Sequence, residues 1–540
     1  MVKFKAEIIE DETGQESSIV RMTKDLQTKL MTLKAIIPAI LDLEKAIETF
    51  RNASSLLLQF GEVSNWDGTV LKEREQAIRE AALELAGQCT ALLLKALSDD
   101  QMALEVANQR TRQSSGFGYQ SQGKKVVKVQ TVGNVEVSLN LNYVLSRYRP
   151  KGNGRKPKKV KTRGKESGQG FYPFLRWLGM EEKVTPMVWS TVALFGMMST
   201  SFATARDQLQ QWGITLSEQR IERLTYCFGQ AGLTLTEQWM EELRKCQLPV
   251  GEMFRGQRVG LNVDGGRTRL RRNKKGTPKA NGRRGYHGEW KEPKLFTLYA
   301  MDDEGKRIRT MEMPITNDGT FGDVEGFMTL LEMYLVKFGV VHATQVLLVA
   351  DGAPWIWQRI PALLKRLGLE AEQIIELIDF YHAAEHLCDF SELVFSDKKQ
   401  AKKWFKKARS NMKHRCFSEV AEKMKTLVDN ISDKDKQEAA ASALPYFIDQ
   451  LQRFAYREVQ AMKLPIGSGA IESLIRQVVN LRLKGNGKFW LPENAEIILH
   501  GRCQWAARQW NQFSQRVLTS GIIPKLASVI AFSVNTEEVA

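Results

Sequence analysis

Three acidic residues, Asp264, Asp351 and Glu472, stand where one expected element of the chain gives way to another. The two aspartates each follow a strand-like segment and precede glycine, and Glu472 lies in the first turn of an expected helix. Carboxylates are the ligands that Mg²⁺ prefers, and a set of them can hold two divalent ions about 3.5–4 Å apart. Such ions activate a water or 3′-hydroxyl and stabilise the leaving oxygen of a phosphodiester. These residue types therefore predict a site for two Mg²⁺ or Mn²⁺ ions, with all three acids as ligands.

Each acid also has an ordinary structural explanation when it is taken alone. Asp264 and Asp351 could end their strands in simple turns, and Glu472 could favour the positive end of a helix dipole. The chemical interpretation gains weight because all three residues fall at compatible points of one fold.

The elements around these acids follow a recognisable order. Val346–Ala350 is a continuous apolar run, as expected for a central strand buried on both faces. A three-strand meander followed by helix, strand, helix and strand places the first and fourth strands side by side and parallel. Asp264 and Asp351 would then share one edge of the sheet, and a crossing helix could add Glu472. We therefore expect an α/β ribonuclease H-like core with strands at 258–264, 295–301, 308–315, 346–350 and 374–378, and helices at 323–339 and 355–367.

Composition points to a polyanionic partner. The chain has 540 residues, a formal net charge of +16 and 43% hydrophobic residues, which suits roughly three or four globular domains. The six cysteines are scattered and form no Cys-x-x-Cys motif, so we expect reduced thiols. No apolar run of about 18 residues and no signal-peptide core occur. We expect a cytoplasmic, nucleoid-associated protein that binds nucleic acid and no membrane.

Basic residues gather in two stretches that lack acids. The stretch after Asp264 is expected to be a loop, and the stretch 147–165 lies among glycines and prolines. A solvated charge run is the ordinary interpretation, but so dense a run of one sign is typical of phosphate binding. The predicted DNA-binding residues are Arg269, Arg271, Arg272, Lys274 and Lys275 in the first stretch and Arg155, Lys156, Lys158 and Lys159 in the second.

The chain before the core is divided into three regions. Residues 1–110 have two helical stripes and predict a helical hairpin, either an intramolecular bundle or a dimerisation device. Residues 111–170 predict a linker at 111–124, a β-hairpin turning at Gly133-Asn134 and the basic linker. Residues 171–250 contain a helix ending at Gly213 and a helix capped by Ser217, the pattern of a helix-turn-helix DNA-binding domain or of plain helix packing.

A helical insertion interrupts the core. The first part of the core spans 251–389, the insertion 390–460, and the second part, with Glu472, spans 461–505. We expect the last helix of the insertion to be interrupted at Pro445, and 494–511 to form an amphipathic helix. Residues 506–540 are assigned to a C-terminal tail.

Three further residues have two interpretations each. Asp379 and His382 follow the last expected strand and could support the metal site and the scissile phosphate, or could cap that strand and hold the next helix. Arg476, one turn after Glu472, could pair with it or contact DNA phosphate.

Several motifs together resemble a known family. Asp351-Gly-Ala-Pro-Trp, Asp379-Phe-Tyr-His382 and Gly467-Ser-Gly-Ala-Ile-Glu472-Ser resemble the DDE transposases of bacterial insertion sequences, particularly the Kra-type group of the Mutator-like branch. The similarity covers roughly 170–505 and implies that Asp264, Asp351 and Glu472 are the catalytic triad. The Cys-x-x-Cys that some relatives carry before the helical region is absent here, so end recognition would depend on basic residues.

The resemblance implies Mg²⁺-dependent cleavage at transposon ends and transfer of the 3′-hydroxyl into target DNA. Its expected partners are double-stranded DNA and, because two ends must be handled together, a second copy in a homodimer or higher homo-oligomer. A ribonuclease H-like nuclease and a catalytically silent, domesticated DNA-binding protein are the alternatives. Joined products separate the transposase from the nuclease, and Mg²⁺-dependent nicking excludes the silent protein.

Overall fold

The chain forms two compact units. The computed structural model describes residues 18–55, 65–113, 119–146, 170–180, 182–273, 277, 280 and 285–520. One unit comprises Met1–Phe228 with Arg516–Pro524, and the other comprises Gly229–Gln515 with Lys525–Ala540. We call them the N-terminal unit and the C-terminal unit and describe each by itself. None of the helices in the described part of the chain is long and apolar enough to cross a membrane.

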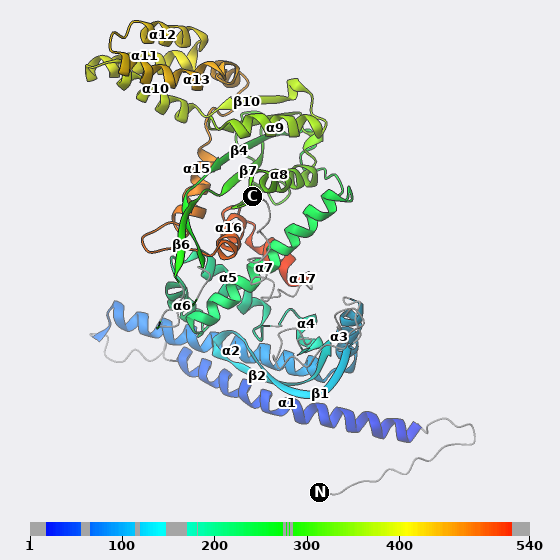
Figure 1. The fold of residues 1–540 in the computed structure, drawn as a ribbon. Coiled ribbons are helices and arrows are strands. Elements are labelled where there is room, and N and C mark those ends of the chain that lie inside the picture. Colours follow the sequence, from blue (N-terminus) through cyan, green and yellow to red (C-terminus); the bar gives the residue numbers. More distant parts are fainter. Residues whose placement is uncertain are drawn as a thin grey trace. The chain divides into compact units, whose positions relative to one another are not determined.

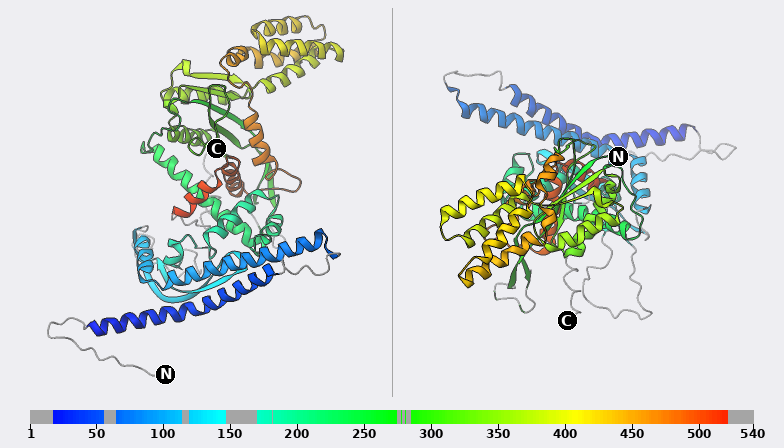
Figure 2. Two further views of the ribbon diagram at one scale, coloured as in Figure 1. Left: turned by 180° about the vertical axis from the view of Figure 1, so that it is seen from behind. Right: turned by 90° about the horizontal axis from the view of Figure 1, so that it is seen from above.

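Long helices open the N-terminal unit. Helix α1 (Ser18–Ser55) packs against α2 (Gly68–Asp99), and α3 (Gln101–Gln113) follows. Asp67 caps α2, because its Oδ1 accepts hydrogen bonds from the backbone N–H groups of Thr69 and Val70, at 2.8 and 2.9 Å. The predicted helical hairpin is confirmed (Figure 2).

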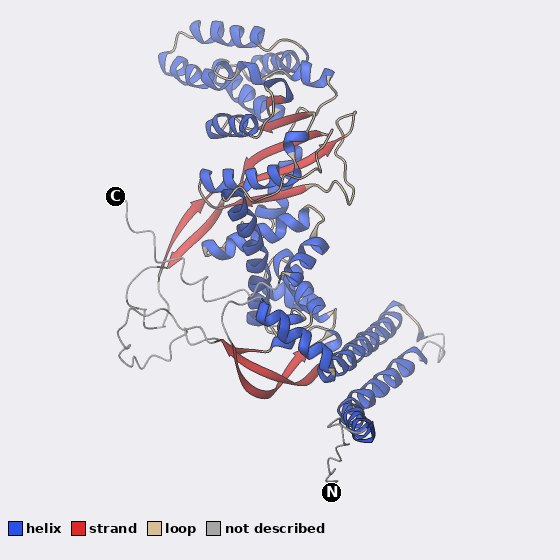
Figure 3. Cartoon of the chain, turned by 90° about the vertical axis from the view of Figure 1, so that its right-hand side faces the viewer, coloured by secondary structure: helices blue, strands red, loops and turns tan. Residues whose placement is uncertain are grey.

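A small antiparallel sheet follows the helices. Strand β1 (Tyr119–Gln130) pairs with β2 (Glu136–Ser146), which pairs with β3 (Gly170–Phe171) (Figure 3). The predicted β-hairpin is confirmed, but the linker predicted at 111–124 is wrong at both ends, where α3 and β1 occupy it. The first half of β1 is exposed and polar, so its sequence shows no apolar alternation.

Helices dominate the next region, as predicted. They are α4 (Pro173–Trp177), α5 (Pro186–Met198), α6 (Phe202–Gln210) and α7 (Glu218–Arg244). Ser217 precedes α7, and its Oγ accepts a hydrogen bond from the N–H of Arg220 at 3.3 Å. The boundary between the two units falls inside α7.

A five-stranded mixed sheet forms the centre of the C-terminal unit. Its strands are β4 (Arg258–Gly265), β7 (Lys294–Met301), β8 (Thr316–Thr320), β9 (Gln345–Ala350) and β10 (Ile374–Ile378). Strand β4 pairs antiparallel with β7 and parallel with β9, β9 pairs parallel with β10, and β7 pairs antiparallel with β8. The predicted parallel pairing of the first and fourth strands is therefore confirmed. The spatial order of the strands is β10-β9-β4-β7-β8.

Helices pack on the sheet around an apolar core. Helix α8 (Val324–Phe338) packs against the sheet through Phe327, whose ring lies 6.0 Å from that of Phe296 on β7, and α9 (Pro354–Arg366) contacts β10. Helix α15 (Gly469–Ile475), which continues as a π-helical turn, packs against β4 and β7. Figure 1 shows α15 on the opposite side of β4 and β7 from α8.

The third strand of the meander was predicted in the wrong place. Residues 308–315 form no strand, and the pairing partner of β7 is the polar segment β8, Thr316–Thr320. Helix α16 (Pro492–Ala506), predicted to be amphipathic, is buried from Ile497 to Gln504 and packs against β8; α17 (Trp510–Thr519) follows. The sequence pattern misleads here because the buried acid of β8, Asp318, is satisfied by partners on other elements.

That acid belongs to a buried polar cluster, which we define as Asp318, Tyr334, Glu496 and His500. Asp318 accepts a hydrogen bond from the Tyr334 hydroxyl at 2.8 Å and lies 3.0 Å from His500 Nδ1. Glu496 accepts from the backbone N–H of Phe321 at 2.8 Å. Burial raises the pKa of Glu496 to about 7.

The basic segment after Asp264 is also more ordered than predicted. It contains β5 (Thr268–Asn273) and β6 (Tyr286–Lys291), which pair antiparallel, so the expected loop is wrong for these residues. Thr268 and Leu270 are buried between exposed arginines, an alternation typical of a strand.

The insertion is helical, as predicted. Its elements are α10 (Phe380–Val394), which starts at the core, then α11 (Lys398–His414), α12 (Ser418–Asp429), α13 (Lys434–Ile448) and α14 (Tyr456–Ala461). Pro445 lies inside α13 and does not interrupt it, so that prediction is wrong. Figure 1 shows α10–α13 side by side.

Candidate active site

Three aspartates lie in one row at the carboxyl edge of the parallel strands. Val263 of β4 is paired with Ala350 of β9, and Ala350 is paired with Ile378 of β10. The next residue on each strand is Asp264, Asp351 or Asp379, respectively. The strand register thus places side by side three acids that are far apart in the sequence.

Strand alternation decides the face on which the first aspartate lies. Val263 is paired with Phe296, whose ring packs on α8. Because successive side chains of a strand point to opposite faces, Asp264 points to the face covered by α15. Glu472, in the first turn of α15, therefore lies on the same side of the sheet as Asp264.

Electrostatics shows that these acids are close enough to influence one another. The pKa of Asp264 is raised to about 6, chiefly by burial, and further by the charges of Asp351 and Glu472. The N–H of Gly265, which donates to Asp264 Oδ1 at 2.6 Å, and the charge of His382 act in the opposite direction. We call Asp264, Asp351 and Glu472 the carboxylate edge.

The carboxylate edge suits a divalent cation by its chemistry. It offers oxygen ligands, and none of its acids forms an ion pair with another described residue. Burial is the chief cause of the raised pKa of Asp264, and the charges of Asp351 and Glu472 add to it; a nearby cation would act against both. Within the described ranges, however, no three acidic, histidine or cysteine side chains come close enough together to hold a metal ion as they stand. The structure brings the triad to one edge without closing it into a metal cage.

Asp379 has the hydrogen bonds of a structural residue. It is fully buried, and its Oδ1 accepts from the N–H groups of Tyr381 and His382 at 2.7 and 2.9 Å, which caps α10. Its Oδ2 accepts from the N–H of Ser468, in the turn before α15. These contacts favour the structural interpretation of Asp379, in which it fixes the turn that leads to Glu472.

Gly467 lies close to a neighbouring ring in that turn. A Cβ on Gly467 would lie 2.7 Å from the ring of Tyr381, which is closer than side-chain atoms approach. The turn therefore packs directly on the start of α10, and the distance along the chain from Gly467 to Glu472 is short. Gly467 thus allows the close approach of this turn to α10, whereas a side chain at Gly469 would meet nothing within 4 Å.

Two side chains beside the edge could act on a substrate. His382 is half-exposed, with Nδ1 3.7 Å from Glu385 Oε2, and its charge is felt by Asp264. Tyr446 of α13 was missed by sequence reasoning. Its buried hydroxyl has no hydrogen-bond partner among the described residues, and its pKa is raised by burial and by Asp351. No local motif marks it, because it reaches Asp351 only through the packing of the insertion.

The predicted DNA-binding residues have different outcomes. Arg269 is exposed and lies over the ring of Trp290, 4.6 Å from its centroid, whereas Arg271 is half-buried. Arg272 is exposed and pairs with Glu289 on β6 at 3.2 Å. Arg476 is exposed at the end of α15. The remaining predicted residues, Lys274, Lys275, Arg155, Lys156, Lys158 and Lys159, lie outside the described residues.

A cavity of about 190 Å³ lies at the base of the β5–β6 hairpin. It is lined by Arg269, Trp290, Lys484 and Lys488, among others. Cationic and aromatic groups around one cavity are typical of contacts to nucleotides. The hairpin and the segment after α15 thus form one basic surface.

The helix-turn-helix pattern of the N-terminal unit has internal partners. The turn between α6 and α7 is held by Asn134, whose Oδ1 accepts from the N–H of Thr215 at 2.7 Å. Arg220 and Arg223 of α7 both pair with Glu182, each at 3.2 Å. These contacts give the turn and the two arginines partners within the protein.

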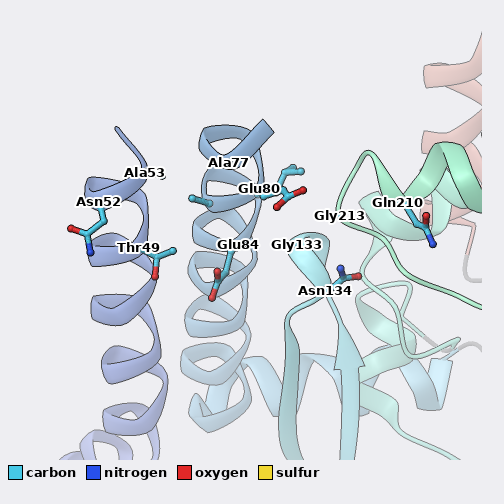
Figure 4. A pocket seen from close by; sticks show the side chains of 12 residues that line it. Thr49, Asn52, Ala53, Ala77, Glu80, Glu84, Gly133, Asn134, Gln210 and Gly213 are labelled. Atoms are coloured by element: carbon cyan, nitrogen blue, oxygen red, sulfur yellow. The ribbon is translucent and has the colours of Figure 1, made fainter. Parts of the chain in front are cut away.

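A larger cavity, of about 600 Å³, lies beside the same turn (Figure 4). Among the described residues, its lining includes Thr49, Asn52, Glu80 and Glu84 and no basic residue. The described lining therefore offers no cationic side chain that could contact a phosphate substrate.

Comparisons of the chain with protein-family models, with curated proteins and with solved structures found no match.

Proposed function

We propose that this protein is a DDE-type DNA transposase with a ribonuclease H-like core, resembling the Kra-type group of the Mutator-like branch. It would cleave DNA at the ends of a mobile element and join the 3′-hydroxyl to target DNA. The observation that carries the proposal is the carboxylate edge: Asp264 and Asp351 follow paired residues of adjacent parallel strands, and Glu472 approaches them on α15.

The core supports this proposal through its strand order. A meander of β4, β7 and β8, extended by the parallel strands β9 and β10, is the arrangement expected of a ribonuclease H-like core. In that arrangement the acids at the strand ends have a rigid support, which phosphoryl chemistry requires. The helical insertion enters directly after β10.

The residues of the edge would divide the work as follows. Asp264, Asp351 and Glu472 would hold two Mg²⁺ or Mn²⁺ ions, which supply activation of the attacking oxygen and stabilisation of the leaving oxygen. Asp379 would hold α15 in place through Ser468, and His382, whose charge acts on Asp264, would contact the scissile phosphate. Glu472 is exposed and stands on a helix of seven residues, so ion binding would have to draw its side chain toward the two aspartates.

The surroundings of the edge suit DNA. The hairpin presents Arg269 with Trp290, and Arg476 lies one turn beyond Glu472 on the same helix. Cations of this kind position the phosphate backbone and carry no sequence information. Double-stranded DNA in the nucleoid is the proposed partner, and the handling of two ends calls for at least two copies of the chain.

The test uses the full chain with supercoiled plasmid carrying the DNA that flanks its gene. Wild-type protein with Mg²⁺ or Mn²⁺ should nick the plasmid and yield joined products, and Asp264→Asn and Asp351→Asn should each abolish both. DNA binding should survive in the variants, as a gel-shift assay would show. Cutting without joining favours the ribonuclease H-like nuclease, and normal activity in either variant removes the proposal.

A further inference from the structure

Helix α11 presents a continuous cationic face. No acidic residue occurs between Lys398 and His414. Its exposed cations are Lys398, Lys399, Lys402, Lys403, Lys406, Lys407 and Arg409. The ion pairs among the described residues include none of them.

The opposite face of the helix is fixed to the insertion. Ala401, Ala408 and Met412 are buried, and the ring of Trp404 lies 5.6 Å from that of Phe390 on α10. At about 100° per residue, Lys399 and Lys406 fall on nearly the same line, away from the buried residues. The apolar side of α11 is therefore used in packing, and the face left to solvent is cationic.

This charge pattern is unfavourable for an isolated helix. Four pairs of lysines stand four residues apart, beginning with Lys398 and Lys402, and like charges at this spacing destabilise a helix. The neighbouring helices are built differently: α12 pairs Lys425 with Glu422 at 2.8 Å, and α13 alternates acids with lysines at its start. A bound polyanion would offset the repulsion among the lysines of α11.

The cationic face begins beside the candidate active site. Arg409 and Lys413 lie over the ring of Phe380, 5.2 and 5.8 Å from its centroid. Phe380 follows Asp379 directly, so this end of α11 adjoins the row of aspartates. From there the 17 residues of α11 extend about 25 Å, at 1.5 Å per residue.

We propose that the exposed face of α11 binds the phosphate backbone of the duplex DNA that enters the carboxylate edge. The proposal rests on the proposed function for the identity of the polymer. A membrane surface fits less well, because lipid binding needs an apolar face and that of α11 is buried. The contact reads no sequence, since lysines bind phosphate as point charges.

The experiment measures binding of the full chain to a short fluorescent duplex of arbitrary sequence, without divalent metal so that no cleavage occurs. The test variant combines Lys399→Gln, Lys402→Gln and Lys406→Gln. The matched control combines Lys423→Gln, Lys434→Gln and Lys436→Gln, which removes three exposed charges from α12 and α13. Both keep good helix formers at exposed positions, and thermal unfolding verifies that each variant folds.

The expected result is a change in salt dependence. The slope of log K against log[salt] is negative, and its magnitude falls by about 0.9 for each phosphate contact that is removed. In the test variant the magnitude of the slope should therefore be about 2–3 smaller than in wild type, measured between roughly 50 and 200 mM salt. The slope of the control variant should match that of wild type.

Three outcomes would overturn the inference: an unchanged slope in the test variant, an equal loss in the control, or a loss seen with an RNA hairpin and not with the duplex. Failure of the proposed function is measured separately. If Asp351→Asn nicks DNA normally while the test variant still lowers the slope, α11 binds DNA and the proposed chemistry is wrong.

Discussion

The C-terminal unit contains two groups of carboxylates that differ in their hydrogen-bond partners: the buried polar cluster and the carboxylate edge. In the buried polar cluster, Asp318 has a tyrosine hydroxyl and a histidine as partners, both also buried. At the carboxylate edge, Glu472 is exposed, and Asp264 has a backbone N–H and the charges of two other acids around it. Asp318 has its partners within the protein, whereas none of the three acids of the edge forms an ion pair with another described residue.

The comparison teaches that residue type alone does not separate catalytic from structural acids. Asp351 and Asp379 both follow parallel strands and both precede a helix. The carboxylate of Asp379 accepts hydrogen bonds from three backbone N–H groups. That of Asp351 accepts one, from the N–H of Ala353 to Oδ1 at 3.0 Å. The number of protein partners, and not the motif, distinguishes them.

Glu472→Gln should give the largest effect, on activity alone. We expect nicking to fall on the order of 10³-fold or more, because a metal ligand is lost, with unfolding by denaturant unchanged. Glu458→Gln is the matched control, since Glu458 is also an exposed acid in the first turn of a helix. If Glu472→Gln nicked DNA at the wild-type rate, Glu472 would not be a metal ligand.

Asp318→Ala should do the reverse and act on stability. It leaves the buried Tyr334 and His500 without their acceptor, so we expect a loss of about 3–5 kcal/mol in the free energy of unfolding. Denaturant titration measures it. The same change at Asp303, an exposed acid of the turn after β7, should stay within about 0.5 kcal/mol. A loss no larger than that control's would show that the cluster contributes little.

Asp379→Asn should produce an intermediate effect on both properties. A hydrogen bond to a charged acceptor contributes about 1.5–3 kcal/mol, and a shift of about 1 Å in α15 would cost on the order of 10²-fold in rate. Unfolding and nicking are measured on the same preparation. Reduced nicking with unchanged unfolding would instead assign Asp379 to the chemistry.

Glu496→Gln should give the smallest effect, visible only against pH. Burial raises the pKa of Glu496 from its ordinary 4.5 to about 7. Its contribution to stability is therefore complete below about pH 4.5 and is lost as the pH rises through 7. As the pH rises from about 5 to 8, the melting temperature of Glu496→Gln should increase relative to that of wild type. If the melting temperatures of the two proteins changed with pH in parallel, the raised pKa of Glu496 would be contradicted. Glu458→Gln is the control, and its melting temperature should keep a constant difference from that of wild type over this pH range.

Much of the core could be predicted because its signals are local. The apolar run Val346–Ala350 and the alternation from Arg258 to Val263 identify strands, and both were found. Strand β8 was missed because its polar residues resemble a loop until Tyr334 and His500 are seen to satisfy Asp318. The β5–β6 hairpin was missed because the arginines hid a regular alternation.

The sequence by itself determined which acids follow which strands, where the glycines of the 467–469 turn lie, and that α11 is cationic, since each depends only on neighbouring residues. Only the tertiary structure decided that Asp264 and Glu472 share one face, because that depends on strand register and on the side of the sheet that α15 covers. The same holds for Asp379, whose hydrogen bond to Ser468 joins residues 89 positions apart.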